Sequence, residues 1–99
     1  MLNINKTVNG SQLTITLEGR LDTTTAPELE QELKASMDGV TDLGFDLAEL
    51  AYVSSAGLRV LLSAQKTMNK QGKMVIRNVR PEIMEIFEVT GFVDILTIE

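Results

Sequence analysis

The chain has 99 residues, 43% of them hydrophobic and 23% charged, a balance that predicts a single folded domain over residues 1–99. Nine basic and fourteen acidic residues give a formal charge of −5, which disfavours nucleic acid and anionic membranes as partners and favours a protein. Because the chain has no cysteine and no histidine, disulfides, thiol catalysis and the commonest metal ligands and catalytic bases are excluded.

A β-hairpin is predicted at the start of the chain. Apolar and polar residues alternate over residues 2–6 and again over residues 13–17. The pair Asn9-Gly10 between these two runs is typical of a tight turn, and Gly19 closes the second strand. We therefore expect two antiparallel strands.

An amphipathic helix follows the hairpin. Residues 22–28 combine threonines that can cap a helix with Pro27, which suits the first turn, and with acidic residues, which favour the positive end of the helix dipole. The apolar side chains of Leu29, Leu33 and Met37 then recur at four-residue spacing. This helix is expected to end near Asp38-Gly39.

The most apolar part of the chain is a hinge between a strand and a helix. Residues 40–47 alternate as a strand and lead through residues 48–51 to Ser54 and Ser55. From Ser55 to about Asn69, apolar residues occupy so wide an arc at helical spacing that the helix should be mostly buried. Two hydroxyl groups thus stand where an apolar strand ends and a buried helix begins.

The last third of the chain predicts a strand, a short helix and another strand. Residues 73–79 read as a strand buried on both faces, and Arg80-Pro81-Glu82 opens a helix that ends near Thr90-Gly91. Residues 92–98 are interpreted as a last edge strand. The order of elements predicts an α/β fold, in which helices pack on a mixed sheet of four to five strands with a parallel core and an N-terminal hairpin.

Two turns of this fold are expected to share one edge of the sheet. Right-handed crossovers place strand-to-helix turns at the carboxyl ends of parallel strands, where α/β proteins hold their sites. The turns concerned are residues 22–27 and 53–57.

Several motifs in order resemble the bacterial anti-sigma factor antagonists of the STAS domain family. They are Gly19-Arg20-Leu21-Asp22 after the hairpin, the strand exit that starts at Asp46-Leu47, the Ser55-Ala56-Gly57-Leu58 hinge, Gly72-Lys73 before a strand, and the pattern F-x-x-x-G-F that ends at Phe92. The resemblance covers nearly the whole chain and implies the STAS fold.

The resemblance implies a phosphorylation switch. An unmodified antagonist of this type binds an anti-sigma factor that is also a GHKL-type serine kinase, and thereby frees a sigma factor for transcription. Phosphorylation ends the capture, and a PP2C-type phosphatase restores it. The family's acceptor lies two residues before the hinge glycine, which corresponds to Ser55. The residue before the acceptor is often aspartate in the family and is Ser54 here, so Ser54 is the alternative acceptor.

Each of these residues also has a purely structural interpretation. The two serines could simply cap the helix, Asp22 could cap the turn before the first helix, and Arg59 could lie at the rim of the buried helix. Gly57 would let a partner's backbone approach closely. The predicted partner surface comprises Asp22, Thr23, Ser54, Ser55, Ala56, Gly57 and Arg59.

Two alternative functions differ in how well the residues support them. The chain could be a structural STAS subunit of a lipid-transport ABC system, an alternative that Ser54 in place of aspartate favours. An enzyme with Ser55 as nucleophile is disfavoured, because the chain has no histidine and neither lysine nor carboxylate adjoins the hinge. No apolar run reaches the roughly 18 residues of a membrane span and no signal peptide is recognisable, so we expect a cytoplasmic protein without membrane insertion, cofactor or metal ion.

Overall fold

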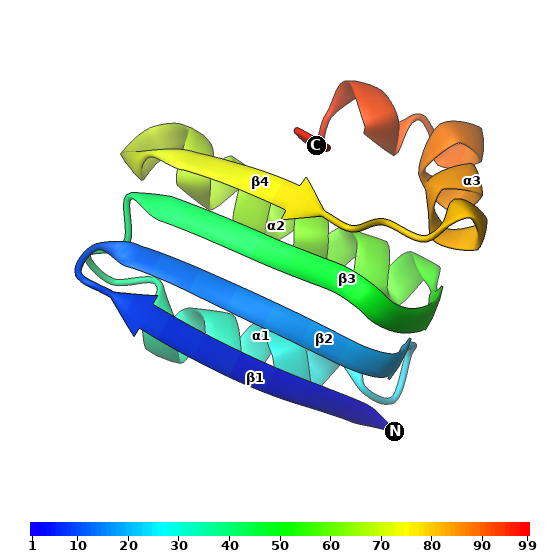
Figure 1. The fold of residues 1–99 in the computed structure, drawn as a ribbon, viewed down its shortest axis with the longest axis horizontal. Coiled ribbons are helices and arrows are strands. Elements are labelled where there is room, and N and C mark those ends of the chain that lie inside the picture. Colours follow the sequence, from blue (N-terminus) through cyan, green and yellow to red (C-terminus); the bar gives the residue numbers. More distant parts are fainter.

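Four strands form one mixed sheet in the order β1-β2-β3-β4 in the computed structural model, which describes all residues 1–99 (Figure 1). Strands β1 (Leu2–Asn9) and β2 (Gln12–Leu21) pair antiparallel as the predicted hairpin. Strands β3 (Asp42–Val53) and β4 (Lys73–Arg77) add to β2 in parallel. The predicted fold class is therefore confirmed, with four strands.

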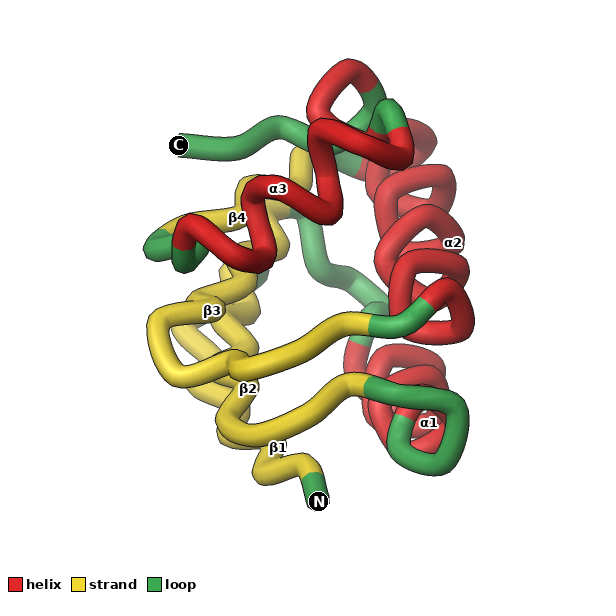
Figure 2. The backbone as a smooth tube through the Cα atoms, turned by 90° about the vertical axis from the view of Figure 1, so that its right-hand side faces the viewer, coloured by secondary structure: helices red, strands yellow, loops and turns green.

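Two helices cover one face of this sheet. Helices α1 (Ala26–Ser36) and α2 (Ser55–Gln71) lie side by side on that face, and α3 (Pro81–Thr90) lies near the carboxyl end of β3 (Figure 2). None of the helices is both long and apolar enough to cross a membrane. The inward-facing side chains of the strands and these helices enclose one cluster of 25 buried hydrophobic residues.

Strand β3 is longer than the sequence pattern indicated. It continues beyond Leu47 to Val53, and its pairing with β2 shifts register twice on the way. At the first shift the carboxylate of Asp46 accepts a hydrogen bond from the backbone N–H of Ala48 at 3.0 Å. Because a register shift interrupts the alternation of buried and exposed residues, the second half of this strand did not show a strand pattern.

The predicted edge strand at residues 92–98 is wrong. Gly91 ends α3 with φ +80°, and a short 3₁₀ helix, η1 (Phe92–Asp94), follows directly. Only an isolated bridge joins Ile98 to Ile76 of β4. Packing of Phe92 and Leu96 against the core explains the apolar residues of this segment, so they do not require a strand.

Candidate functional site

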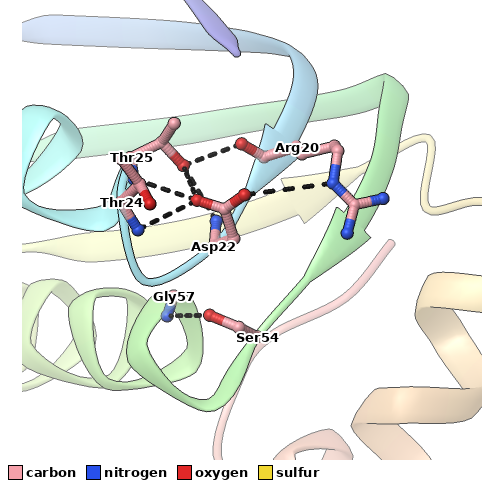
Figure 3. Close-up of polar contacts among 6 residues, drawn as sticks. All are labelled: Arg20, Asp22, Thr24, Thr25, Ser54 and Gly57. Carbon is pink, nitrogen blue, oxygen red and sulfur yellow. Dashed lines mark hydrogen bonds and ion pairs between the residues drawn. The ribbon is translucent and has the colours of Figure 1, made fainter.

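The two predicted turns do meet at the carboxyl edge of the sheet. Leu21 at the end of β2 pairs with Val53 at the end of β3, and the backbone N–H of Ser54 donates to the carbonyl oxygen of Leu21 at 2.8 Å. The first turn leads into α1 and the second into α2. The β2–α1 junction and the β3–α2 junction are therefore neighbours in space (Figure 3).

At the β2–α1 junction, the carboxylate of Asp22 caps its own turn. Its Oδ1 atom accepts the backbone N–H groups of Thr24 and Thr25, both at 3.0 Å. The Thr25 hydroxyl donates to the carbonyl oxygen of Arg20 and accepts the N–H of Asp22, both at 2.8 Å. The Thr25 N–H, with further help from the Thr25 hydroxyl and the Thr24 N–H, holds the pKa of Asp22 below its ordinary value against the weaker opposite effect of burial.

The structural interpretation of Asp22 is thus confirmed. The sequence indicated that one of the threonines could cap α1. Thr25 is the N-cap residue, but it makes no side-chain hydrogen bond of that kind and instead ties the turn back to the end of β2. The spacing of Asp22 before two threonines is a signal of such a turn. The contact of Thr25 with Arg20, by contrast, depends on the path of the chain through the junction.

The β3–α2 junction uses far fewer polar contacts. Ser54 is the N-cap residue of α2 and its Oγ accepts the backbone N–H of Gly57, at the long distance of 3.3 Å. Ser55 is exposed, and its hydroxyl has no hydrogen-bond partner within the chain. The cap predicted for this serine pair therefore belongs to Ser54, and the Ser55 hydroxyl remains open to solvent.

Gly57 contacts the ends of both strands. A Cβ atom at this position would lie 2.7 Å from Cγ of Leu21 and 2.9 Å from Cγ2 of Val53. Gly57 is buried, and other residues of this chain occupy the space that a side chain at this position would need. The close approach that was expected for a partner's backbone is thus made by β2 and β3 instead.

Three of the predicted surface residues share a hollow. Thr23, Ala56 and Arg59 line a space of about 230 Å³ between the first turns of α1 and α2. Its other lining residues are Ala26, Pro27, Glu30 and Val60. Asp22, Ser54, Ser55 and Gly57 do not line it, so the predicted residues lie on adjoining parts of the edge rather than around one cavity.

A second hollow, between α1 and α2, was not anticipated from the sequence. A space of about 220 Å³ continues along α1 and α2 between Leu33, Met37 and Ala64, and it shares Glu30 and Val60 with the first hollow. These residues also carry the helical periodicity of the core, so their pattern does not separate a groove from buried packing.

Arg20 and Tyr52 face each other across β2 and β3. They are register partners, and the guanidinium carbon of Arg20 lies 4.4 Å from the centre of the Tyr52 ring. The Nε atom of Arg20 is also 3.9 Å from Oδ2 of Asp22. Because strand pairing decides this contact, sequence spacing alone could not reveal it.

The sequence model of the STAS domain family matches residues 3–99. The protein BtrV of Bordetella bronchiseptica is 39% identical over 84 residues, which cover 83% of this chain and 72% of BtrV. The anti-sigma-B factor antagonist of Staphylococcus aureus is 33% identical over 97 residues, which cover 96% of this chain and 90% of that protein.

Solved structures show the same fold. An anti-sigma factor antagonist from Mycobacterium paratuberculosis superposes with a TM-score of 0.89 at 21% identity, covering 99% of this chain and 85% of that one. The Bacillus cell fate determinant SpoIIAA in its phosphorylated form superposes with a TM-score of 0.75 at 17% identity, covering 100% and 91%.

Proposed function

Because the chain belongs to the STAS domain family, we propose that it is an anti-sigma factor antagonist controlled by phosphorylation of Ser55. The unmodified protein binds an anti-sigma factor of the GHKL serine kinase type in the cytoplasm and thereby releases a sigma factor. Phosphorylation weakens this binding, and a PP2C-type phosphatase reverses the modification. In this role the chain is a regulatory binding protein and not an enzyme.

The observation that carries the proposal is the exposed, unpaired hydroxyl of Ser55 at the first residue of α2. A phosphate at a helix N-terminus faces free backbone N–H groups and the positive end of the helix dipole, so the fold tolerates it. It also adds a charge of about −1.5 to −2. A partner surface that covers unmodified Ser55 must accommodate this charge, or the contact is lost. The modification therefore acts on the complex without unfolding the antagonist.

Ser55 is favoured over Ser54 by their surroundings. The Ser54 hydroxyl is half-buried and already accepts the N–H of Gly57, whereas that of Ser55 is exposed and unpaired. Phosphorylation of Ser54 would remove the only side-chain cap of α2. A kinase can reach and modify Ser55 with the helix start intact.

The modification itself is a phosphoryl transfer from ATP. The Ser55 oxygen forms the new bond to the γ-phosphorus while the bond from that phosphorus to the bridging oxygen of ADP breaks. The hydroxyl proton passes to a base of the kinase. The antagonist contributes an accessible nucleophile and no catalytic group.

The test combines phosphorylation and binding. The purified chain is incubated with ATP and an anti-sigma factor kinase from the same organism, and the modified residue is identified by peptide mass mapping. Binding of that kinase is then measured for wild type, Ser55→Ala and Ser55→Asp. We expect phosphate on Ser55, binding by wild type and Ser55→Ala, and a loss of about tenfold or more for Ser55→Asp.

Two results would contradict the proposal. Absence of any complex between wild type and the kinase would exclude the antagonist function. Equal binding by Ser55→Asp and Ser55→Ala would exclude a charge switch at this residue. The matched control Ser11→Asp adds the same charge at an exposed serine in the turn between β1 and β2, at the opposite end of β2 from the junctions, and should bind the kinase like wild type.

A further inference from the structure

Helix α2 has a charge composition unlike the rest of the chain. The protein holds fourteen acidic residues, yet none falls within the 17 residues of α2. Its only charged residues are Arg59, Lys66 and Lys70. In this acidic protein, every charged residue of α2 is therefore basic.

These three cations are also the ones that the fold leaves unpaired. Every other basic side chain lies within 4.0 Å of an acidic side chain; the pairs involve Lys6, Arg20, Lys34, Lys73, Arg77 and Arg80. Arg59, Lys66 and Lys70 are exposed and have no acidic partner within the chain. Their charges are therefore available to another molecule.

Helical geometry places the three cations on one side of α2. Lys66 follows Arg59 by seven residues and Lys70 follows Lys66 by four, spacings that return to the same side of an α-helix. We call Arg59, Lys66 and Lys70 the basic face of α2. Ser55 precedes Arg59 by four residues and so begins the same line.

The neighbouring helix limits what can bind there. Helix α1 lies beside α2 (Figure 2) and carries exposed acidic residues, including Glu28 and Glu30. Glu30 lines both hollows between the two helices and shares the first of them with Arg59. A polyanion such as DNA or an anionic membrane carries negative charge over its whole surface and would be repelled by α1. A protein surface with only a local acidic strip can contact α2 without facing the acidic residues of α1.

We propose that the basic face of α2 docks an acidic strip on the anti-sigma factor, and that phosphate on Ser55 weakens this docking by pairing with Arg59. The inference rests on the proposed function and extends it from one residue to the length of a helix. It explains why three cations of an acidic chain remain unpaired along the line that starts at Ser55.

The pairing with Arg59 follows from helix geometry. Side chains four residues apart on a helix are neighbours, and an acidic group N-terminal to a basic one is the favourable order. Helical side chains also lean toward the N-terminus, so Arg59 reaches back toward Ser55. A phosphate on Ser55 therefore competes with a partner's carboxylate for the same guanidinium.

The first experiment removes charge from the distal part of the basic face. Binding of the kinase to Lys66→Gln/Lys70→Gln is measured at two salt concentrations and compared with Arg77→Gln/Arg80→Gln, which removes the same charge from paired residues outside α2. We expect a loss of about 2- to 30-fold in affinity for the first variant, mostly through slower association, and a weaker salt dependence. The second variant should bind like wild type.

The second experiment tests the role of Arg59. The affinity lost on phosphorylation of Ser55 is measured in the wild type and in Arg59→Gln. If the phosphate acts partly through Arg59, unmodified Arg59→Gln binds more weakly than wild type and loses less on phosphorylation. An equal fold-loss in both backgrounds would overturn the coupling.

The possible failures are distinguishable. If wild type does not bind the kinase, the proposed function itself fails. If wild type binds and Lys66→Gln/Lys70→Gln binds equally well, only the docking surface is excluded. Retention of wild type, but not of that variant, on duplex DNA or on anionic vesicles would assign the basic face to a polyanion and overturn docking to a protein.

Discussion

The two junctions at the carboxyl edge differ in how they use their polar groups. At the β2–α1 junction, Asp22 and Thr25 bind each other and the backbone around them, so their polar side chains are largely committed to holding the turn. At the β3–α2 junction, Ser54 makes one long capping hydrogen bond and Ser55 makes none. Both turns nevertheless join a parallel strand to a helix on the same face of the sheet.

This difference separates a structural turn from an accessible one. The closed network of the first junction fixes the chain beside the second, since Leu21 accepts the N–H of Ser54 and packs against Gly57. The position of Ser55 therefore depends on the β2–α1 junction, whose own polar groups are not available for modification. Five substitutions test this division, in order of expected effect on stability.

Gly57→Val should have the largest effect because it disrupts the packing between the two junctions. The new side chain would overlap with Leu21 and Val53, both fully or almost fully buried. We expect destabilisation near the upper end of about 1–3 kcal/mol, the usual cost of overpacking. Urea unfolding measures it against Ser63→Val, an exposed change on the same helix. A stability like that of Ser63→Val would mean that the junctions are not tightly packed together.

Thr25→Val tests whether the first junction is held by its hydroxyl. The substitution keeps the shape of the buried Thr25 side chain but removes the partner of the part-buried Arg20 carbonyl and Asp22 N–H. The expected loss is about 1–3 kcal/mol. Chemical denaturation of Thr25→Val and Thr25→Ser distinguishes the cause, because serine retains the hydroxyl and should lose less. Equal losses would assign the effect to packing of the methyl group.

Ser54→Ala removes the cap of α2 and should cost about 1 kcal/mol or less, since the capping hydrogen bond is long at 3.3 Å. The comparison with Thr25→Val is the informative one. If thermal unfolding shows that Ser54→Ala is the more destabilising of the two, the second junction is more committed to structure than its contacts indicate.

Asp22→Asn should lower stability modestly at neutral pH and should change its pH dependence, because asparagine keeps an acceptor for the turn but lacks the carboxylate charge that the N–H groups of Thr24 and Thr25 favour. The pKa of Asp22 is lowered in the folded chain by its hydrogen bonds. That stabilisation is present above the ordinary pKa of aspartate, about 3.9, and is lost as pH falls through the lowered pKa. The advantage of wild type over Asp22→Asn should therefore shrink in acid, and a difference that stays constant down to pH 2 would contradict this account.

Ser55→Ala should have the smallest effect. The hydroxyl is exposed and makes no hydrogen bond, so the free energy of unfolding should stay within about 0.5 kcal/mol of wild type. The same variant prevents phosphorylation in the proposed switch. A large destabilisation would show that Ser55 supports the fold and would make its binding data harder to assign to a partner contact.

Local signals were sufficient for much of the fold. Asn9-Gly10 between two alternating runs predicted the hairpin, and Pro27 with the spacing of Leu29 and Leu33 predicted α1. Turn chemistry and helical periodicity act over a few residues, so the amino-acid sequence displays them directly. The serine pair was recognised in the same way, as polar residues at the start of an apolar helix.

The outcome at particular positions depended on contacts between distant segments. The local pattern of residues 92–98 suited a strand, but packing of Phe92 and Leu96 on the core made it a turn. The chain's path back to Arg20 gave Thr25 its partner, and the paired strand ends enclosed Gly57.

The sequence by itself therefore determined where each junction lies and which residue types it contains. Tertiary structure decided which of those residues are engaged in hydrogen bonds or ion pairs. Ser54 caps α2 and the Ser55 hydroxyl has no partner, and the cations of α2 have no acidic partner although the chain has many acidic residues. The physical reason is that a side chain's availability depends on every group brought near it by folding, and strand register and helix packing set those distances.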